Sequence, residues 1–104
     1  MNCKAEFLEE IGERKLLCAI IDCYKTDDKK IALLKVGYSL DDLAFFLECL
    51  DFEYDDGLEG QNLFGTIWYQ DGTWSDRAEY DGSEWWVYRA CPKIPSALQL
   101  SRRQ

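Results

Sequence analysis

Paired carboxylates are the side chains of this sequence that could do acid–base chemistry. Asp76 lies three residues before Glu79, and Asp81 lies three residues before Glu84. Two neighbouring carboxylates can act as general acid and general base when their surroundings separate the two pKa values. Acids are abundant in this chain, so neither spacing is specific. We expect Asp76, which lies among aromatic residues and close to arginines, to be a hydrogen-bonded structural carboxylate.

Other catalytic and metal-binding patterns are missing from the sequence. The chain has no histidine, which removes the commonest general base, the usual partner of a nucleophilic serine or cysteine, and the commonest metal ligand. Its five cysteines form no Cys-x-x-Cys pair, so their spacing does not predict a zinc site. A calcium loop beginning at Asp51 fails because its glycine falls at the seventh position. We therefore expect no enzyme, no cofactor and no metal.

The cysteines and the N-terminus indicate a compartment. Cys18, Cys23 and Cys49 lie within apolar runs, where free thiols behave as small core residues in a reducing environment. Charged residues interrupt the N-terminus from Lys4 onward, which does not fit a signal peptide. No apolar run is long enough to cross a membrane. The expected location is the cytoplasm, without contact to a membrane.

Negative charge is concentrated in the middle of the chain. The net charge is −8, and residues 41–84 hold thirteen acids and one base. A field of this sign repels nucleic acid and attracts a basic protein surface. We therefore expect a protein partner with a basic surface and no direct binding of nucleic acid. The simpler alternative is a solvated acidic face that keeps the protein soluble.

Hydrophobic periodicity predicts the elements that position these groups. The fold class is α+β, with a mixed or antiparallel sheet of about five strands: a β-hairpin, a helix and a three-stranded meander. One main helix packs on one face, and a short helix begins the chain. We expect a single domain over residues 1–104, globular over 1–95, with 96–104 as one helical turn or a disordered tail. The expected helices are residues 4–11 and 40–51, and the expected strands are residues 15–24, 30–38, 63–70, 73–80 and 83–90.

The main helix has two different faces. It begins with a capping box, in which Ser39 and Asp42 exchange hydrogen bonds with the backbone. A helical repeat of apolar residues predicts the side that packs on the sheet, and acids alternate with phenylalanine on the outer side. The inner residues are Leu40, Leu43, Ala44, Leu47 and Leu50, and the outer residues are Asp41, Phe45, Glu48 and Phe52.

The outer side of this helix and the loop after it form a candidate interaction surface. Carboxylates spaced in this way can dock on a basic surface, and the exposed phenylalanine would add contact area. The surface consists of Asp41, Asp42, Phe45, Glu48, Asp51, Glu53, Asp55, Asp56 and Glu59.

The two Asp-Gly turns of the meander set its register. A two-residue first turn places Tyr69 opposite Trp74, and Trp68 opposite Ser75. The second turn is open between two loop lengths: two residues would place two glutamates opposite each other, whereas three residues would avoid this. For both lengths Trp85 and its neighbour point to opposite faces of the sheet.

Aromatic residues of the meander form a second candidate surface. Tyrosine and tryptophan are preferred anchors at interfaces, because they bury a large area with few rotatable bonds. The simpler alternative is that they are the core of a small domain. This candidate aromatic face consists of Trp68, Trp74, Arg77, Trp85, Trp86 and Tyr88.

Residues 65–95 (GTIWYQDGTWSDRAEYDGSEWWVYRACPKIP) carry a resemblance. They resemble small uncharacterised proteins of tailed bacteriophages and prophages, in which a strand of the "GTIWF-DGSW" kind leads into "YDG-EWW" and a proline. Residues 80–86 (YDGSEWW) are the most distinctive part. The resemblance implies an accessory phage protein acting in the bacterial cytoplasm, and it carries no catalytic residues.

Two functions follow as hypotheses. The first is an acidic protein that binds a host protein, as an inhibitor or a mimic of nucleic acid, and a homodimer is compatible with it. The second is a module for a small nucleotide-like ligand, in which the aromatic face stacks a base while Arg77 and Arg89 hold a phosphate.

Overall fold

The structure, a computed structural model, describes residues 1–24, 30–54 and 61–99. These residues form two α-helices, five β-strands and one 3₁₀ turn, which confirms the expected α+β class. In chain order the elements are α1 (Cys3–Ile11), β1 (Leu16–Cys23), β2 (Lys30–Leu34), α2 (Leu40–Cys49), β3 (Leu63–Tyr69), β4 (Trp74–Tyr80), β5 (Ser83–Arg89) and the turn Ser96–Leu98.

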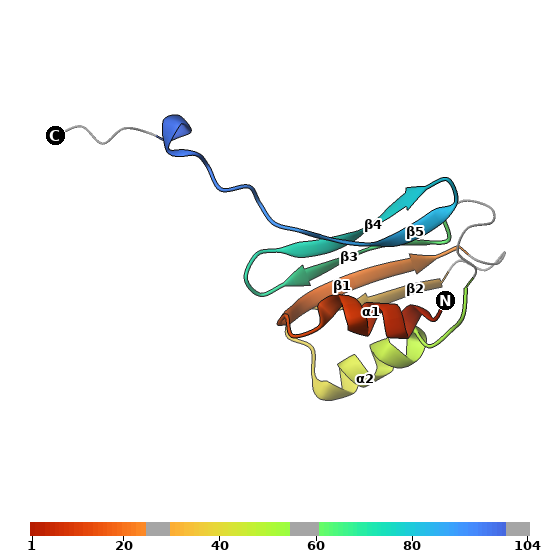
Figure 1. Cartoon of the computed structure of the whole chain (residues 1–104). Coiled ribbons are helices and arrows are strands. Elements are labelled where there is room, and N and C mark those ends of the chain that lie inside the picture. The colour runs from red at the N-terminus through yellow and green to blue at the C-terminus, as the bar shows by residue number, and fades with distance from the viewer. Residues whose placement is uncertain (25–29, 55–60, 100–104) are drawn as a thin grey trace.

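The five strands form one antiparallel sheet in the order β2-β1-β3-β4-β5. Because β1 pairs with both β2 and β3, the chain returns from the edge strand β2 to β3 through α2. Figure 1 shows α1 and α2 on the same side of this sheet, so no α-helix of the described residues covers the opposite side. We name the side under the helices the covered face and the other side the open face.

Both helices begin with the local signals that the sequence contains. Asn2 caps α1 by accepting a hydrogen bond of 2.9 Å from the Ala5 amide, and α1 ends at Gly12. At α2 the expected capping box is confirmed. The Ser39 hydroxyl accepts from the Asp42 amide at 3.1 Å, and the Asp42 carboxylate accepts from the Ser39 amide at 3.0 Å. Each cap satisfies backbone amides that the helix leaves unpaired.

The packed side of α2 differs from the predicted one. Phe46 and Leu50 are buried, whereas Leu40 and Ala44 are exposed, so the prediction was wrong for those two residues. The reason is the position of α1, which lies beside α2 on the same face. Phe46 meets Phe7 of α1 edge to face, with ring centroids 5.3 Å apart. The helix is therefore rotated to bury a side that contacts both the sheet and α1.

The core lies between the two helices and the covered face. Directly opposite partners in the sheet share a face, so the pairs Ala19–Leu34 and Ala19–Ile67 align core residues across three strands. Gly65 belongs to this face, where a Cβ would lie 2.6 Å from the Ile20 carbonyl oxygen. Only glycine therefore lets β3 approach β1 this closely. The core consists of Cys3, Phe7, Leu16, Ala19, Ile21, Cys23, Ala32, Leu34, Phe46, Leu50, Tyr54, Leu63, Ile67 and Tyr69.

The first meander turn has three residues, and the expected two-residue register was wrong. Trp68 pairs with Trp74, and the Tyr69 amide donates to the Thr73 carbonyl at 2.9 Å. The Asp71 carboxylate accepts a hydrogen bond from the Thr73 amide at 3.0 Å, which favours the longer loop. As a result, Trp68 and Trp74 share one face, and Tyr69 points to the other.

The second meander turn has two residues. Tyr80 pairs with Ser83, and both central residues have positive φ, 52° at Asp81 and 86° at Gly82. These values define a type I′ turn, which matches the twist of a hairpin. Trp85 and Trp86 point to opposite faces, as alternation requires.

After β5 the chain leaves the sheet. Figure 1 shows residues 90–99 running away from the sheet and the helices, and Ile94 and Leu98 are exposed there. A 3₁₀ turn is present at Ser96–Leu98, the first of the two alternatives considered for this segment. Among the described residues, no helix has the length and apolar character needed to span a membrane.

Candidate functional site

The open face presents apolar side chains on all five strands. Trp68, Trp85 and Phe64 each keep between 41% and 43% of their surface exposed, although they lie within strands. At the β2 edge Ile31 and Leu33 are more than half exposed. The residues that share this face by strand pairing are Cys18, Ile20, Asp22, Ile31, Leu33, Phe64, Thr66, Trp68, Trp74, Asp76, Ala78, Tyr80, Ser83, Trp85, Val87 and Arg89.

Few charges interrupt this apolar surface. Arg89 donates to the Asp76 carboxylate at 2.7 Å, so two of the three charged residues neutralise each other. Asp76 is thus a hydrogen-bonded carboxylate, as expected. The third charged residue of the open face is Asp22, whose Oδ1 is buried without a hydrogen-bond partner among the described residues. The open face is therefore apolar with a weak negative charge.

The structure divides the predicted aromatic face between the two sides of the sheet. Trp68 and Trp74 lie on the open face, where Trp85 joins them. Ser75 pairs with Tyr88, and Arg77 pairs with Trp86, which places those two pairs on the covered face. The six residues do not form one surface. Sequence reasoning also missed Ile31, Leu33 and Phe64, because nothing in the sequence indicated that the first hairpin lies next to the meander.

A buried ion pair lies on the covered face. Arg77 Nη2 donates to Glu84 Oε1 at 2.8 Å, and the two side chains are 1% and 0% exposed. The Glu84 carboxylate also accepts hydrogen bonds from the backbone amides of Asn62 at 2.7 Å and Leu63 at 2.9 Å. These three donors satisfy both carboxylate oxygens and fix the start of β3 against β5. This ion pair was hard to predict from the sequence, because Arg77 and Glu84 lie on different strands with a turn between them.

Tyr54 extends this cluster towards α1. Its hydroxyl accepts from Arg77 Nη2 at 3.1 Å and donates to the Glu6 carboxylate. Burial, together with the hydrogen bond to Glu6, raises the pKa of Tyr54 above its ordinary value. Burial works to lower the pKa of Arg77, but hydrogen bonding to Glu84 raises it overall. The tyrosine is therefore neutral and the arginine charged at neutral pH.

The Arg77 guanidinium keeps unused donors. Nε and Nη1 are buried without a hydrogen-bond partner among the described residues, as is the indole nitrogen of Trp86. The guanidinium carbon lies 5.1 Å from the centroid of the Trp86 ring and 5.9 Å from that of Tyr54. Contact with aromatic faces partly compensates a buried cation. Arg77 is enclosed and cannot reach a ligand on the open face.

A second polar group links α1 to β4. The Ser75 hydroxyl donates to the Glu10 carboxylate at 2.6 Å and lies 2.7 Å from the Tyr69 hydroxyl. Arg14 lies over Tyr88, with 3.7 Å from its guanidinium carbon to the ring centroid. Tyr88 thereby packs against the segment that follows α1, and it does not belong to the open face.

The predicted acidic surface is only partly described. Asp41 and Glu48 are exposed on α2, and the Phe45 ring between them is 69% exposed. The Asp42 carboxylate caps the helix. At the end of this surface the Asn2 amide donates to Asp51 at 3.3 Å and to Glu53 at 2.8 Å. Asp55, Asp56 and Glu59 lie outside the described residues.

The thiols show no arrangement for catalysis or metal binding within the described part of the chain. No group of three His, Cys, Asp or Glu side chains there could hold a metal ion. Burial raises the pKa of the Cys3 thiol from 9.0 to about 12, although nearby Arg77 works in the opposite direction. Cys3 is therefore protonated at neutral pH and unsuited to act as a nucleophile. Cys49 and Cys91 are exposed.

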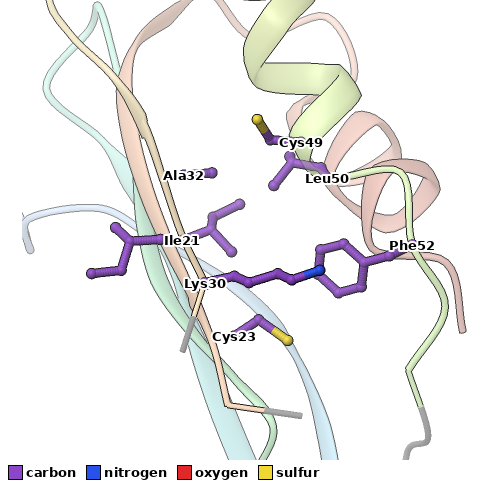
Figure 2. Close-up of a pocket in the computed structure, with 8 residues that line it drawn as sticks. Ile21, Cys23, Lys30, Ala32, Cys49, Leu50 and Phe52 are labelled. Carbon is purple, nitrogen blue, oxygen red and sulfur yellow. The ribbon is translucent and has the colours of Figure 1, made fainter. Parts of the chain in front are cut away.

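An apolar cleft of about 280 Å³ lies on the covered face, between the end of α2 and the β1–β2 hairpin. Figure 2 shows Leu50 and Cys49 on its helix side, and Ile21, Ala32 and Lys30 on its strand side. It lies on the other side of the sheet from the open face and reaches Ile31 at the β2 edge. This cleft could not be predicted from the sequence, because it depends on how α2 packs over the β1–β2 hairpin.

Comparison of the chain with protein-family models, with curated proteins and with solved structures finds no match in any of the three.

Proposed function

We propose that this protein is an interaction module that binds another protein through its open face. The observation that carries the proposal is the exposure of large apolar side chains within strands, above all Trp68, Trp85 and Phe64. Contiguous exposed apolar patches mark interaction sites when they reach several hundred Å². Tryptophan is also among the residues that contribute most to binding energy in protein interfaces.

The dimensions of the open face suit a protein partner. Five strands spaced about 4.8 Å apart, with about seven residues each at 3.3 Å, give a flat area on the order of 500 Å². A standard interface buries about 800 Å² on each partner. Side chains that project from the sheet, together with residues at its rim, would supply the remaining contact area.

Charge selects the kind of partner. The protein carries a net charge of −8, so two copies repel each other while a basic protein is attracted. The exposed acids Asp41 and Glu48 lie on α2, on the far side of the sheet from the open face. They contribute to the long-range field and do not enter the contact. The proposed partner therefore presents an apolar patch surrounded by lysine and arginine.

The biological setting is proposed from the resemblance of residues 65–95 to phage and prophage proteins. In that setting the partner is a host protein, and binding takes place in the bacterial cytoplasm. The nucleotide-like ligand gains no support, because Arg77 is enclosed on the covered face and Arg89 is paired with Asp76.

A capture experiment tests the proposal. The immobilised protein is incubated with bacterial lysate at low and high salt, beside a Trp68→Ser/Trp85→Ser variant and a Phe45→Ser control on α2. We expect a protein that is retained by the wild type and the control, lost with the double variant, and bound more weakly at high salt.

Two outcomes would contradict the proposal. One is retention of the same protein by the double variant, provided that circular dichroism shows both variants folded. The other is a dimer of the wild type in sedimentation equilibrium that the double variant does not form, because a second copy would then occupy the open face.

A further inference from the structure

Three of the side chains that line the cleft beneath α2 are small. Cys23 and Ala32 line it from the sheet, and Cys49 lines it from the helix. The pairing of Ile21 with Ala32 places the smallest of these side chains opposite the end of α2. Larger residues at these positions would close the gap, so the sequence itself leaves the space open.

The size of the cleft defines what it can hold. Its volume of about 280 Å³ is roughly twice that of an engineered apolar cavity that binds benzene, about 150 Å³. An aliphatic chain of about eight to ten carbons matches this volume. Leu50, Ile21 and Phe52 would contact such a chain.

One cation lies at the cleft. Figure 2 shows the Lys30 side chain extending from β2 along the cleft, with its ammonium on the side where Phe52 lies. The described residues provide Lys30 with no ion pair, and it is exposed to solvent. A lysine can pack its methylene stem on apolar surface while its ammonium binds an anion.

We propose that the cleft binds a medium-chain aliphatic carboxylate, with the chain between α2 and the β1–β2 hairpin and the carboxylate on Lys30 Nζ. The ammonium selects an acidic head group, which is otherwise disfavoured by the net charge of −8. This site lies on the other side of the sheet from the open face, and the residue that the two have in common is Ile31 at the β2 edge.

Calorimetric titration with decanoate and with decanol tests the proposal. We expect saturable binding of decanoate to the wild-type protein. Lys30→Met should weaken decanoate about two- to fivefold, which is typical of an exposed ion pair, and should leave decanol unchanged. Lys35→Met is the matched control, since Lys35 is exposed after β2 and does not line the cleft.

Filling the cleft tests its location. Ala32→Leu should weaken both ligands at least tenfold while circular dichroism shows the native fold. A second measurement serves even if that variant does not fold: decanoate should slow the alkylation of Cys49, which lines the cleft, and not that of Cys91, which is exposed after β5.

Three results would overturn the proposal. The first is the absence of saturable binding of decanoate, the second is equal weakening of decanoate and decanol by Lys30→Met, and the third is unchanged alkylation of Cys49. None of these results bears on the open face, so failure here and failure of the proposed protein interaction are distinguishable.

Discussion

Glu79 and Glu84 lie directly opposite each other across the β4–β5 hairpin, but only Glu84 enters the protein interior. The Glu79 carboxylate turns back to the hairpin and accepts from the Gly82 amide at 3.0 Å. Glu84 binds Arg77 at 2.8 Å. Two like charges in opposite positions are unfavourable on their own. Here each carboxylate has its own donors, and the two-residue turn is retained.

The buried pair should be far more important for stability than the exposed one. Arg77→Met leaves the Glu84 carboxylate buried without its cation, and removing one partner of such a pair costs about 3–5 kcal/mol of unfolding free energy. Arg89→Met removes the partner of Asp76 on the half-exposed open face and should cost less than about 1 kcal/mol. Urea denaturation of the two variants measures the difference. Equal losses would show that Arg77 is not the cation that holds Glu84.

Gly65 should not tolerate a side chain. A Cβ there would lie 2.6 Å from the Ile20 carbonyl oxygen and 3.2 Å from Ile21 Cα, so Gly65→Ala must push β3 away from β1. We expect a loss of about 2 kcal/mol or more, in the upper range of overpacking substitutions. Thr66→Ala, one residue later on the open face, should cost less than about 1 kcal/mol. A urea midpoint of Gly65→Ala at the wild-type value would refute this close approach.

The protein should lose stability in alkaline solution. Folding raises the pKa of Cys3 from 9.0 to about 12, and it also raises the pKa of Tyr54. Between pH 9 and pH 12 the unfolded chain releases the Cys3 proton while the folded protein keeps it. The contribution of Cys3 is therefore complete below pH 9 and decreases above it, by at most about 1.4 kcal/mol per pH unit.

Cys3→Ala separates the thiol from the other alkaline groups. The variant should show a smaller decrease in unfolding free energy than the wild type as the pH rises above 9, measured by urea denaturation at a series of pH values. Cys91→Ala, which replaces an exposed thiol, should follow the wild-type curve. Parallel curves for wild type and Cys3→Ala would contradict the burial of this thiol.

The elements of this fold could be predicted from the sequence because their signals are local. The capping box at Ser39, the glycine that ends α1 and the Asp-Gly turns are short-range patterns. Two features could not be predicted in this way. The side on which α1 packs and the length of the first meander turn depend on tertiary contacts and on the Asp71 side chain.

The candidate site was harder to predict than the fold. Trp68, Trp74 and Trp85 were selected as candidates and lie on the same face of the sheet, but alternation along the strands could not place them before the register was known. Arg77 was assigned to that surface because it is charged and lies among aromatic residues. Its burial depends on its ion pair with Glu84. The two-residue turn, unlike the three-residue alternative, places Glu84 on the same face of the sheet as Arg77.

A titration of the captured partner against two single variants tests the role of the open face most directly. Trp85→Ser alters an exposed tryptophan of the proposed contact, and Phe45→Ser alters an exposed aromatic residue of similar character on α2. We expect Trp85→Ser to weaken binding of the purified partner by at least about 2 kcal/mol, near thirtyfold, as for a tryptophan that anchors an interface. Phe45→Ser should bind as the wild type does. Wild-type affinity of Trp85→Ser, together with loss of binding by Phe45→Ser, would assign the interaction to α2 and contradict the role proposed for the open face.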